Sequence, residues 1–237
     1  MRRVVACAAL ALAASAAAAG PASVTAVGSF QSEAGCASDW DPACAATHLT
    51  YDAGDAVWQG AFAMPAGSYE YKVALDDAWD ASYPAVQLPL APAETTVVKF
   101  YYDDATHDVA DSSSGGIPVV AGDFQSELGC PGDWQPDCLR SWLRDPDGDG
   151  RFVFATTALP PGSYACKVAI GESWDENYGA GGAPGGANIG FSVVSAGDLV
   201  TFRFDGATHV LQIAPEPGAS TAALAGVAML VARRRAR

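Results

Sequence analysis

The sequence predicts an all-β protein made of two tandem immunoglobulin-like antiparallel β-sandwich modules, and three observations support this fold class. First, residues 30–44 recur as residues 124–138, with ten of the fifteen positions identical at a spacing of 94 residues. Second, runs rich in β-branched and aromatic residues alternate with Gly, Pro, Asp and Asn clusters, a pattern typical of short strands joined by turns. Third, no stretch between the two ends of the chain has a sustained helical period. A repeat of this length is a whole small domain, because solenoid repeats are only about 20 to 50 residues long.

At the N-terminus, the first 19 residues have the pattern of a secretory signal peptide. Arg2 and Arg3 precede an apolar run, and three alanines at 17–19 provide the small residues of a cleavage site. We therefore expect residues 1–19 to form a signal helix that engages the export machinery and is then removed.

The first module is expected to span residues 22–111. Its strand-like runs share a high content of β-branched and aromatic residues and lie at 24–30, 57–62, 69–75 and 95–102. Residues 69–75 alternate large apolar side chains with smaller or charged ones, which predicts a strand with one buried face. Trp58 alternates with Phe62 along its run and becomes Phe152 in the other copy, so we expect Trp58 in the core.

Residues 112–117 are expected to form a linker between the modules, and residues 118–214 the second module. The Ser- and Gly-rich sequence at 111–116 has the composition of a flexible linker, which predicts that the modules move independently. The run at 164–170 repeats the alternation of its counterpart in the first module. About six or seven strands in a module of about 90 residues match an immunoglobulin-like sandwich.

The C-terminal residues 215–237 are expected to form a sorting or anchoring segment with a short apolar helix. Pro-Glu-Pro at 215–217 precedes an apolar stretch of about 15 residues, shorter than the roughly 20 that cross a bilayer core, and a cluster of arginines follows. This arrangement resembles the PEP-CTERM sorting signal of Gram-negative bacteria, which implies contact with a sorting machinery and delivery to the cell surface. The alternative is a tail anchor with its arginines on the cytoplasmic side.

The acidity of the chain excludes several classes of partner. Six of the 13 Lys and Arg residues and one of the 27 Asp and Glu residues lie in segments 1–19 and 215–237, which leaves 7 basic against 26 acidic residues in the body. A body with about 19 net negative charges repels nucleic acid and anionic lipid. We expect no nucleic-acid partner, and membrane contact only through the terminal segments.

The cysteines predict two disulfides. Cys36 and Cys44 are eight positions apart, and Cys130 and Cys138 repeat this spacing in the second module. Export favours oxidation, and two thiols without neighbouring Cys or His ligands are too few for zinc. A short closed loop of this kind contributes about 2 to 3 kcal/mol by restricting the unfolded chain. Cys7 lies in the predicted signal segment. Cys166 is left over in the second module, and we expect it to be a buried, inert thiol, with a reactive or intermolecular role as the alternative.

The repeated strings resemble a known family. Both copies contain Gln-Ser-Glu-x-Gly-Cys-x-x-Asp-Trp-x-Pro-x-Cys followed by Pro-x-Gly-Ser-Tyr-x-x-Lys, and the second adds Ser-Trp-Asp-Glu-Asn-Tyr-Gly at 173–179 and Gly-Gly-Ala-Asn-Ile at 185–189. These strings are similar to the X25 module of bacterial pullulanases and amylopullulanases. Such modules are accessory β-sandwiches of starch-degrading enzymes, related in shape to starch-binding domains of outer-membrane glycan-capture proteins. The first copy lacks the Glu, Asn and Gly of the 173–179 loop, which favours the second module as the binder.

The resemblance implies α-glucan as the partner, and the residues offer the matching chemistry. A glucan presents apolar ring faces that stack on aromatic side chains, and hydroxyls that bond to carboxylates and amides. The predicted ligand-binding residues of the second module are Trp134, Trp174, Asp175, Asn177 and Tyr178. Those of the first module are Trp40, Trp79 and Tyr83. The alternative for Trp79 and Trp174 is a structural role, in which the indole plugs the end of the sandwich core.

Two features of the second module lack a close counterpart in the first. The acidic sequence at 145–150 resembles the start of a calcium loop, but Thr156 stands where an EF-hand needs its glutamate. Asp-Gly between two strands is foremost a hairpin turn, so we predict no metal, and we predict no cofactor. Trp142 replaces His48 of the first module, and we expect it to lie at the surface or to be a peculiarity of the second module.

No catalytic residues can be assigned. The chain has three histidines, none near a serine or cysteine nucleophile in a known motif. A starch-hydrolase barrel needs about 250 residues, for which no room remains, although paired carboxylates for glycoside hydrolysis stay an open alternative in so acidic a chain. We predict an exported, noncatalytic carbohydrate-binding-like protein that binds or displays α-glucan of the starch or pullulan type at the cell surface. The alternative is a structural or adhesive spacer of an extracellular polysaccharide matrix, without a sugar site.

Overall fold

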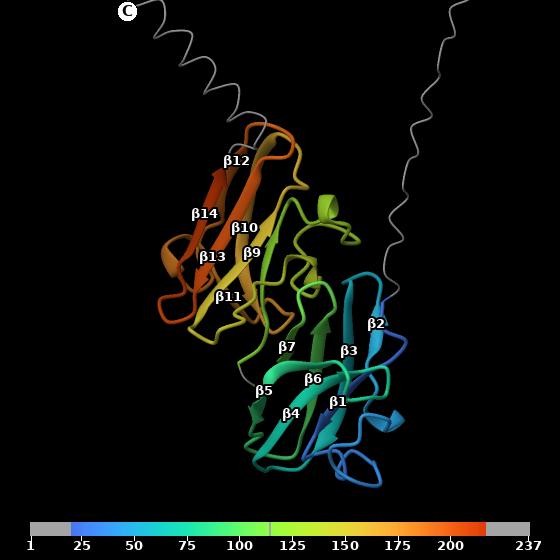
Figure 1. The fold of residues 1–237 in the computed structure, drawn as a ribbon. Coiled ribbons are helices and arrows are strands. Elements are labelled where there is room, and N and C mark those ends of the chain that lie inside the picture. Colours follow the sequence, from blue (N-terminus) through green and yellow to red (C-terminus); the bar gives the residue numbers. More distant parts are fainter. Residues whose placement is uncertain (1–19, 114, 217–237) are drawn as a thin grey trace, which may run out of the picture.

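The computed structural model describes residues 20–113 and 115–216. The predicted signal helix and nearly all of the predicted C-terminal segment lie outside these residues. No helix within the described ranges has the length and apolar character needed to cross a membrane. The described chain is all-β, with strands β1–β7 in its first half and β8–β14 in its second (Figure 1).

Two antiparallel sheets form the first module. The first sheet has the order β1-β4-β5 and comprises Val24–Gly28, Tyr69–Leu75 and Ser82–Leu90. The second sheet has the order β2-β3-β6-β7 and comprises Thr50–Asp52, Val57–Met64, Thr96–Asp103 and Asp108–Asp111. A short 3-10 helix, η1, covers Ala45–Thr47.

The second module repeats this plan. In its first sheet, β10 pairs with β8, β11 and β12; these strands are Gly162–Ile170, Pro118–Gly122, Glu176–Tyr178 and Ile189–Val193. Its second sheet has the order β14-β13-β9 and comprises Leu211–Glu216, Leu199–Asp205 and Arg151–Thr156. Three 3-10 helices, η2 to η4, cover Ser126–Leu128, Leu139–Ser141 and Ala180–Gly182.

Strand β14 corrects one predicted boundary. The second module was expected to end at residue 214, yet Pro215 pairs with Val200 and Glu216 pairs with Leu199 of β13. The proline is tolerated because β14 is an edge strand, where a missing N–H need not break the ladder. The last strand therefore continues into the segment that we assigned to sorting.

Each module has its own apolar core between its two sheets. Phe30 stacks on Phe100 in the first core with ring centroids 5.1 Å apart, and Phe124 stacks on Phe202 in the second at 5.5 Å. Trp58 is half-buried and packs against the first core, as predicted. The repetition of the phenylalanine pair shows that the sequence repeat is also a repeat of core packing.

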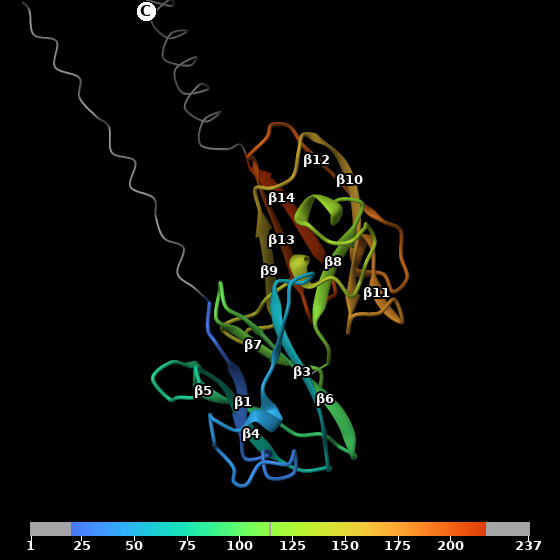
Figure 2. The ribbon, with the colours of Figure 1, turned by 90° about the vertical axis from the view of Figure 1, so that its right-hand side faces the viewer.

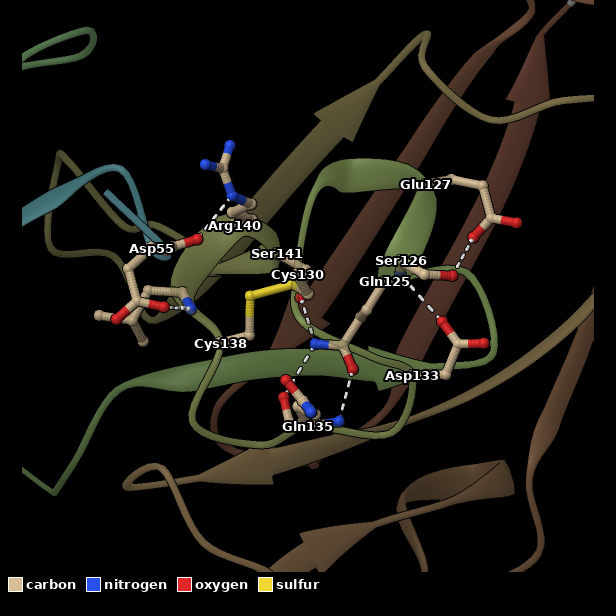
Figure 3. Close-up of a disulfide and its surroundings, with 12 residues drawn as sticks. Asp55, Gln125, Ser126, Glu127, Cys130, Asp133, Gln135, Cys138, Arg140 and Ser141 are labelled. Atoms are coloured by element: carbon tan, nitrogen blue, oxygen red, sulfur yellow. Dashed lines mark hydrogen bonds between the residues drawn. A yellow bond between two sulfur atoms is a disulfide. The ribbon is translucent and has the colours of Figure 1, made fainter. Parts of the chain in front are cut away.

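Both predicted disulfides are present, and each loop that they close is organised by a buried glutamine. Cys36 is bonded to Cys44 and Cys130 to Cys138. In the second module, the Gln125 amide nitrogen donates to the Gln135 carbonyl at 2.9 Å, and its oxygen accepts from the Gln135 N–H at 2.8 Å (Figure 3). Gln31 makes the same pair of bonds to Asp41 in the first module, at 2.9 and 2.8 Å.

The two modules pack against each other across a shared apolar cluster. Its buried members come from both modules and comprise Val57, Tyr101, Ile117, Val119, Leu139 and Trp142. Strands β3, β6 and β7 lie on the side of the first module that faces the second (Figure 1 and Figure 2). Trp142 is 3% exposed, with its ring centroid 6.3 Å from that of Tyr101. The prediction of a surface position for Trp142 is therefore wrong.

Polar contacts surround this cluster. The Lys99 ammonium donates to Glu172 at 2.7 Å, and Tyr101 also donates its hydroxyl to Glu172. The Leu139 N–H donates to Asp55 at 2.9 Å. Arg144 forms ion pairs with two carboxylates of the first module, those of Asp103 and Asp108. We expected the 112–117 linker to let the modules move independently, whereas these contacts join them and Ile117 of that segment is buried between them.

Candidate functional site

Two tryptophans from separate loops of the second module lie side by side. Trp134 belongs to the disulfide loop, and Trp174 belongs to the turn between β10 and β11. Their ring centroids are 6.4 Å apart and their planes are tilted by 39°. Trp174 is 38% exposed and Trp134 is half-buried. The exposed position of Trp174 excludes the core-plug interpretation, and the pair presents an aromatic surface to solvent.

The loop that carries Trp134 is held in place from several sides. The backbone N–H of Trp134 donates to the Gly122 carbonyl at 3.0 Å, and the backbone of the next residue, Gln135, is bound by the Gln125 side chain. Asp133 accepts from the Ser126 N–H at 2.9 Å (Figure 3). Because these bonds and the disulfide fix the backbone, the Trp134 ring is oriented before any ligand arrives. A pre-oriented ring loses little conformational freedom on binding.

The Trp174 turn supplies polar groups next to the ring. The Ser173 hydroxyl accepts from the Asp175 N–H at 3.0 Å, and the Asn177 amide donates to the Trp174 carbonyl at 2.9 Å. The carboxylate of Asp175 is exposed and has no partner among the described residues. Asn177 acts here mainly as a clamp on the turn, whereas Asp175 is available to a ligand hydroxyl.

Two predicted ligand residues each have one ring face covered by a histidine. Tyr178 is only 8% exposed and stacks on His209 with centroids 3.9 Å apart. Its equivalent, Tyr83, stacks on His107 at 4.0 Å. One face of each tyrosine ring is thus occupied by an imidazole and cannot receive a sugar, so the candidate site is built on the tryptophans alone. Each of these histidines follows a threonine at an equivalent place near the end of its module, at 106–107 and 208–209, and this recurring Thr-His pair is the signal in the sequence for the packing.

The first module does not reproduce the tryptophan pair. Trp79 is 47% exposed and Trp40 is half-buried. No ring contact joins them in the described part of the chain, although each has the same place in the repeat as its counterpart. The loop after Trp79 lacks the Glu, Asn and Gly of the second module. The candidate site therefore belongs to the second module.

The acidic loop at 145–150 is a hairpin turn. Asp145 accepts from the N–H groups of Asp149 and Gly150 at 3.1 and 2.8 Å, while Arg144 pairs with Val153 across the turn. The Asp145, Asp147 and Asp149 carboxylates each have an oxygen within 4.8 Å of the others. The turn hydrogen bonds explain the position of Asp145 without a cation.

Comparison with known proteins identifies relatives for both modules. The family model described as the pullulanase X25 domain matches residues 23–109 and again residues 117–211. The chain is 36% identical over 195 residues to an amylopullulanase of Thermoanaerobacterium thermosulfurigenes, covering 77% of this chain and 10% of that protein. It is 34% identical over 198 residues to an amylopullulanase of Thermoanaerobacter thermohydrosulfuricus, covering 80% of this chain and 13% of that protein. This chain thus spans only a small part of these relatives.

A solved pullulanase from Bacillus acidopullulyticus is also similar. The match covers 83% of this chain and 28% of that one, with 18% sequence identity and a TM-score of 0.37.

Proposed function

This chain belongs to the pullulanase X25 domain family, and from that premise we propose that it is a noncatalytic protein that binds α-glucan through its second module. The observation that carries the proposal is the contact between Trp134 and Trp174, which are 40 positions apart in the sequence and form one aromatic surface. Aromatic rings bind sugars through their apolar faces, and Asp175 beside the pair offers an acceptor for hydroxyls.

The tilt between the two rings favours an α-linked chain. A β-1,4-glucan is a flat ribbon whose sugar faces suit coplanar rings, whereas an α-1,4-glucan curves along its length. Two rings inclined by 39° follow a curved chain better than a flat one. We therefore expect binding of amylopectin and pullulan, and little binding of an unrelated β-glucan.

We propose that the chain has no catalytic activity of its own. The environment of the three histidines supports this. His107 and His209 stack on tyrosines, His48 pairs with Asp77 at 3.1 Å, and none of the three contacts a serine or cysteine side chain among the described residues. The two disulfides support export, since such bonds persist in oxidising compartments. We place the protein outside the cell or at the surface of a Gram-negative bacterium, with residues 215–237 as a sorting or anchoring segment.

The second candidate function is a structural or adhesive spacer of an extracellular polysaccharide matrix. The packed interface between the modules favours it, because a fixed arrangement of two sandwiches suits a rigid spacer. The two candidates differ in one property, the retention of α-glucan by the Trp134 and Trp174 surface.

Affinity electrophoresis of the full chain in gels that contain amylopectin, pullulan or a β-glucan tests the proposal. We expect selective retardation by the two α-glucans, weakened about twofold to tenfold in Trp174→Ala, since aromatic stacking contributes about 0.5 to 1.5 kcal/mol. Trp79→Ala is the matched control, because it removes an exposed tryptophan without a ring partner. Circular dichroism checks that each variant is folded. Equal mobility in all gels, or equal losses in Trp174→Ala and Trp79→Ala, contradicts the proposed site.

A further inference from the structure

The same sheet face has opposite character in the two modules. Trp58 pairs with Tyr102 in the first module, and Phe152 pairs with Phe204 in the second, so these pairs are equivalent. Their outward-facing neighbours in the first module are apolar and comprise Val57, Tyr101 and Ala110. The equivalent positions of the second module are polar and comprise Arg151, Arg203 and Gln212.

This difference determines which face is covered. The apolar face of the first module is buried beneath the second module, where Tyr101 meets Trp142 and Val57 joins the shared cluster. The polar face of the second module is left open, with Arg151, Arg203 and Gln212 exposed. A further copy of the second module does not fit on this face. The surface around Trp142, with which such a copy would make the contact, is already packed against the first module of its own chain.

The open face is hollowed into a groove of about 770 Å³, which is within the range of about 300 to 1,000 Å³ for ligand sites. Apolar side chains such as Val153 and Val210 contribute to its lining, and the 145–150 turn forms one wall. A second hollow of about 420 Å³ shares Val153 and Pro146 with it. That hollow reaches Asp108 of the first module, so the concave surface continues to the module boundary.

The polar groups of this groove are available to a ligand. Neither Arg203 nor Gln212 has a side-chain partner among the described residues, and the ion pair between Arg151 and Asp149 is long at 3.9 Å. Asp205 accepts from the N–H groups of Thr208 and Ala207, and these hydrogen bonds lower its pKa, so the carboxylate stays ionised.

The charges of the groove define the kind of ligand that fits. Two guanidinium groups and the three carboxylates of Asp147, Asp149 and Asp205 nearly balance. Such a site gives no net attraction to a polyanion, but it offers donors and acceptors side by side. Vicinal hydroxyls of a neutral sugar can donate to a carboxylate and accept from a guanidinium at the same time.

We propose that this groove is a second carbohydrate-binding site, which takes a short neutral oligosaccharide of α-linked glucose by hydrogen bonding rather than by aromatic stacking. The choice of α-linked glucose rests on the proposed function of the Trp134 and Trp174 surface. The groove and the aromatic surface would then bind the same polymer. Two weak sites on one protein hold a polymer more tightly together than either site does alone.

A single titration separates the two sites. The full chain, labelled with ¹⁵N, is titrated with maltoheptaose at mildly acidic pH, with cellohexaose as the comparison ligand. The Arg203 Nε–H signal, assigned with Arg203→Lys, reports on the groove, and the Trp174 indole N–H signal reports on the aromatic surface. We expect both signals to shift with maltoheptaose. Gln212→Ala should weaken the affinity reported by the Arg203 signal about threefold to tenfold, and it should leave the affinity reported by the Trp174 signal unchanged. Gln87→Ala, at an exposed position on β5 of the first module, is the matched control.

Each outcome decides between the two sites. A shift of Trp174 without a shift of Arg203 overturns the groove and leaves the proposed function intact. A shift of Arg203 alone supports the groove and contradicts the aromatic surface. No shift in either signal overturns both, and the polar face is then only a solvated surface of the second module.

Discussion

The glutamine that recurs in both copies explains why so much of the repeated sequence is structural. Gln31 and Gln125 are fully buried, and each bonds to the N–H and the carbonyl of the residue after a tryptophan. These backbone groups belong to a loop without strand partners, and buried groups of this kind need a partner. The amide side chain therefore substitutes for a strand, and it fixes Trp40 and Trp134 in the same place of each module.

At the same scale, Cys166 is expected to be unreactive in the folded chain. The side chain is buried, and burial raises the pKa of the thiol to about 12 from an ordinary value of 9.0. At pH 8 the folded protein should react with iodoacetamide at least about a hundredfold more slowly than the urea-unfolded protein, because the thiolate is the nucleophile. Equal alkylation rates in the two states would show an accessible thiol and contradict this expectation.

The raised pKa of Cys166 also has a consequence for stability. The neutral thiol is favoured in the folded state, so its contribution is complete below the unfolded pKa near 9 and is lost as the pH rises towards about 12. Comparison of urea unfolding of the native chain and Cys166→Ala across this interval isolates the effect. The native chain should lose more stability with rising pH than the variant.

Single residues were predictable from the sequence where a local pattern sufficed. The disulfides followed from equal spacings in two copies, and the burial of Cys166 followed from its alternation with Val168 along one strand. The burial of Tyr178 did not follow, because it depends on His209, which arrives from a distant turn. The sequence left the exposure of the Trp174 ring as one of two alternatives, and the structure shows the ring exposed.

At the scale of elements, the two equivalent disulfide loops provide an internal control. Cys130→Ala with Cys138→Ala removes the bond beside Trp134, and Cys36→Ala with Cys44→Ala removes its counterpart in the first module. Each double variant should lose about 2 to 3 kcal/mol of unfolding free energy in urea titrations. Only the second-module variant should also lose retention in amylopectin gels, because only that loop orients a paired tryptophan. Equal retention by both variants would show that the loop does not organise the site.

Strands with clear alternation were predicted best. The expected strand 69–75 is observed as β4 with the same bounds, Tyr69–Leu75. Strand β5, Ser82–Leu90, was not predicted, because Pro84 and Pro89 argue against a strand. Both prolines are tolerated since β5 is at the edge of the β1-β4-β5 sheet, and edge position is not visible in a local pattern.

At the scale of the whole molecule, the relation between the modules was the least predictable feature. The Ser- and Gly-rich linker indicated independent movement, since its composition gives no sign of what its neighbours contact. The interface depends on outward-facing residues of several strands, such as Val57 and Tyr101, that become one surface only after the sheet has formed. Alignment of Tyr101 with Arg203 on equivalent strands shows which module offers an apolar face and which keeps a polar one.

The interface therefore predicts that the two modules behave as one rigid body. Spin labels at Ser68→Cys and Ser163→Cys, two exposed serines of different modules, should give a narrow distance distribution by pulsed electron paramagnetic resonance. Trp142→Ala should broaden it and lower the unfolding free energy by about 3 to 5 kcal/mol, because a buried tryptophan at the centre of the contact is lost. The buried Cys166 should remain unlabelled.

Trp79→Ala is the control for this experiment, because Trp79 is exposed and does not belong to the shared cluster. It should leave both the distance distribution and the stability close to those of the native chain. A broad distribution in the native chain would restore the flexible linker as the correct description. In that case the groove and the aromatic surface of the second module would still be fixed relative to each other, because both are built within a single module, but the first module would no longer be held at the end of the groove.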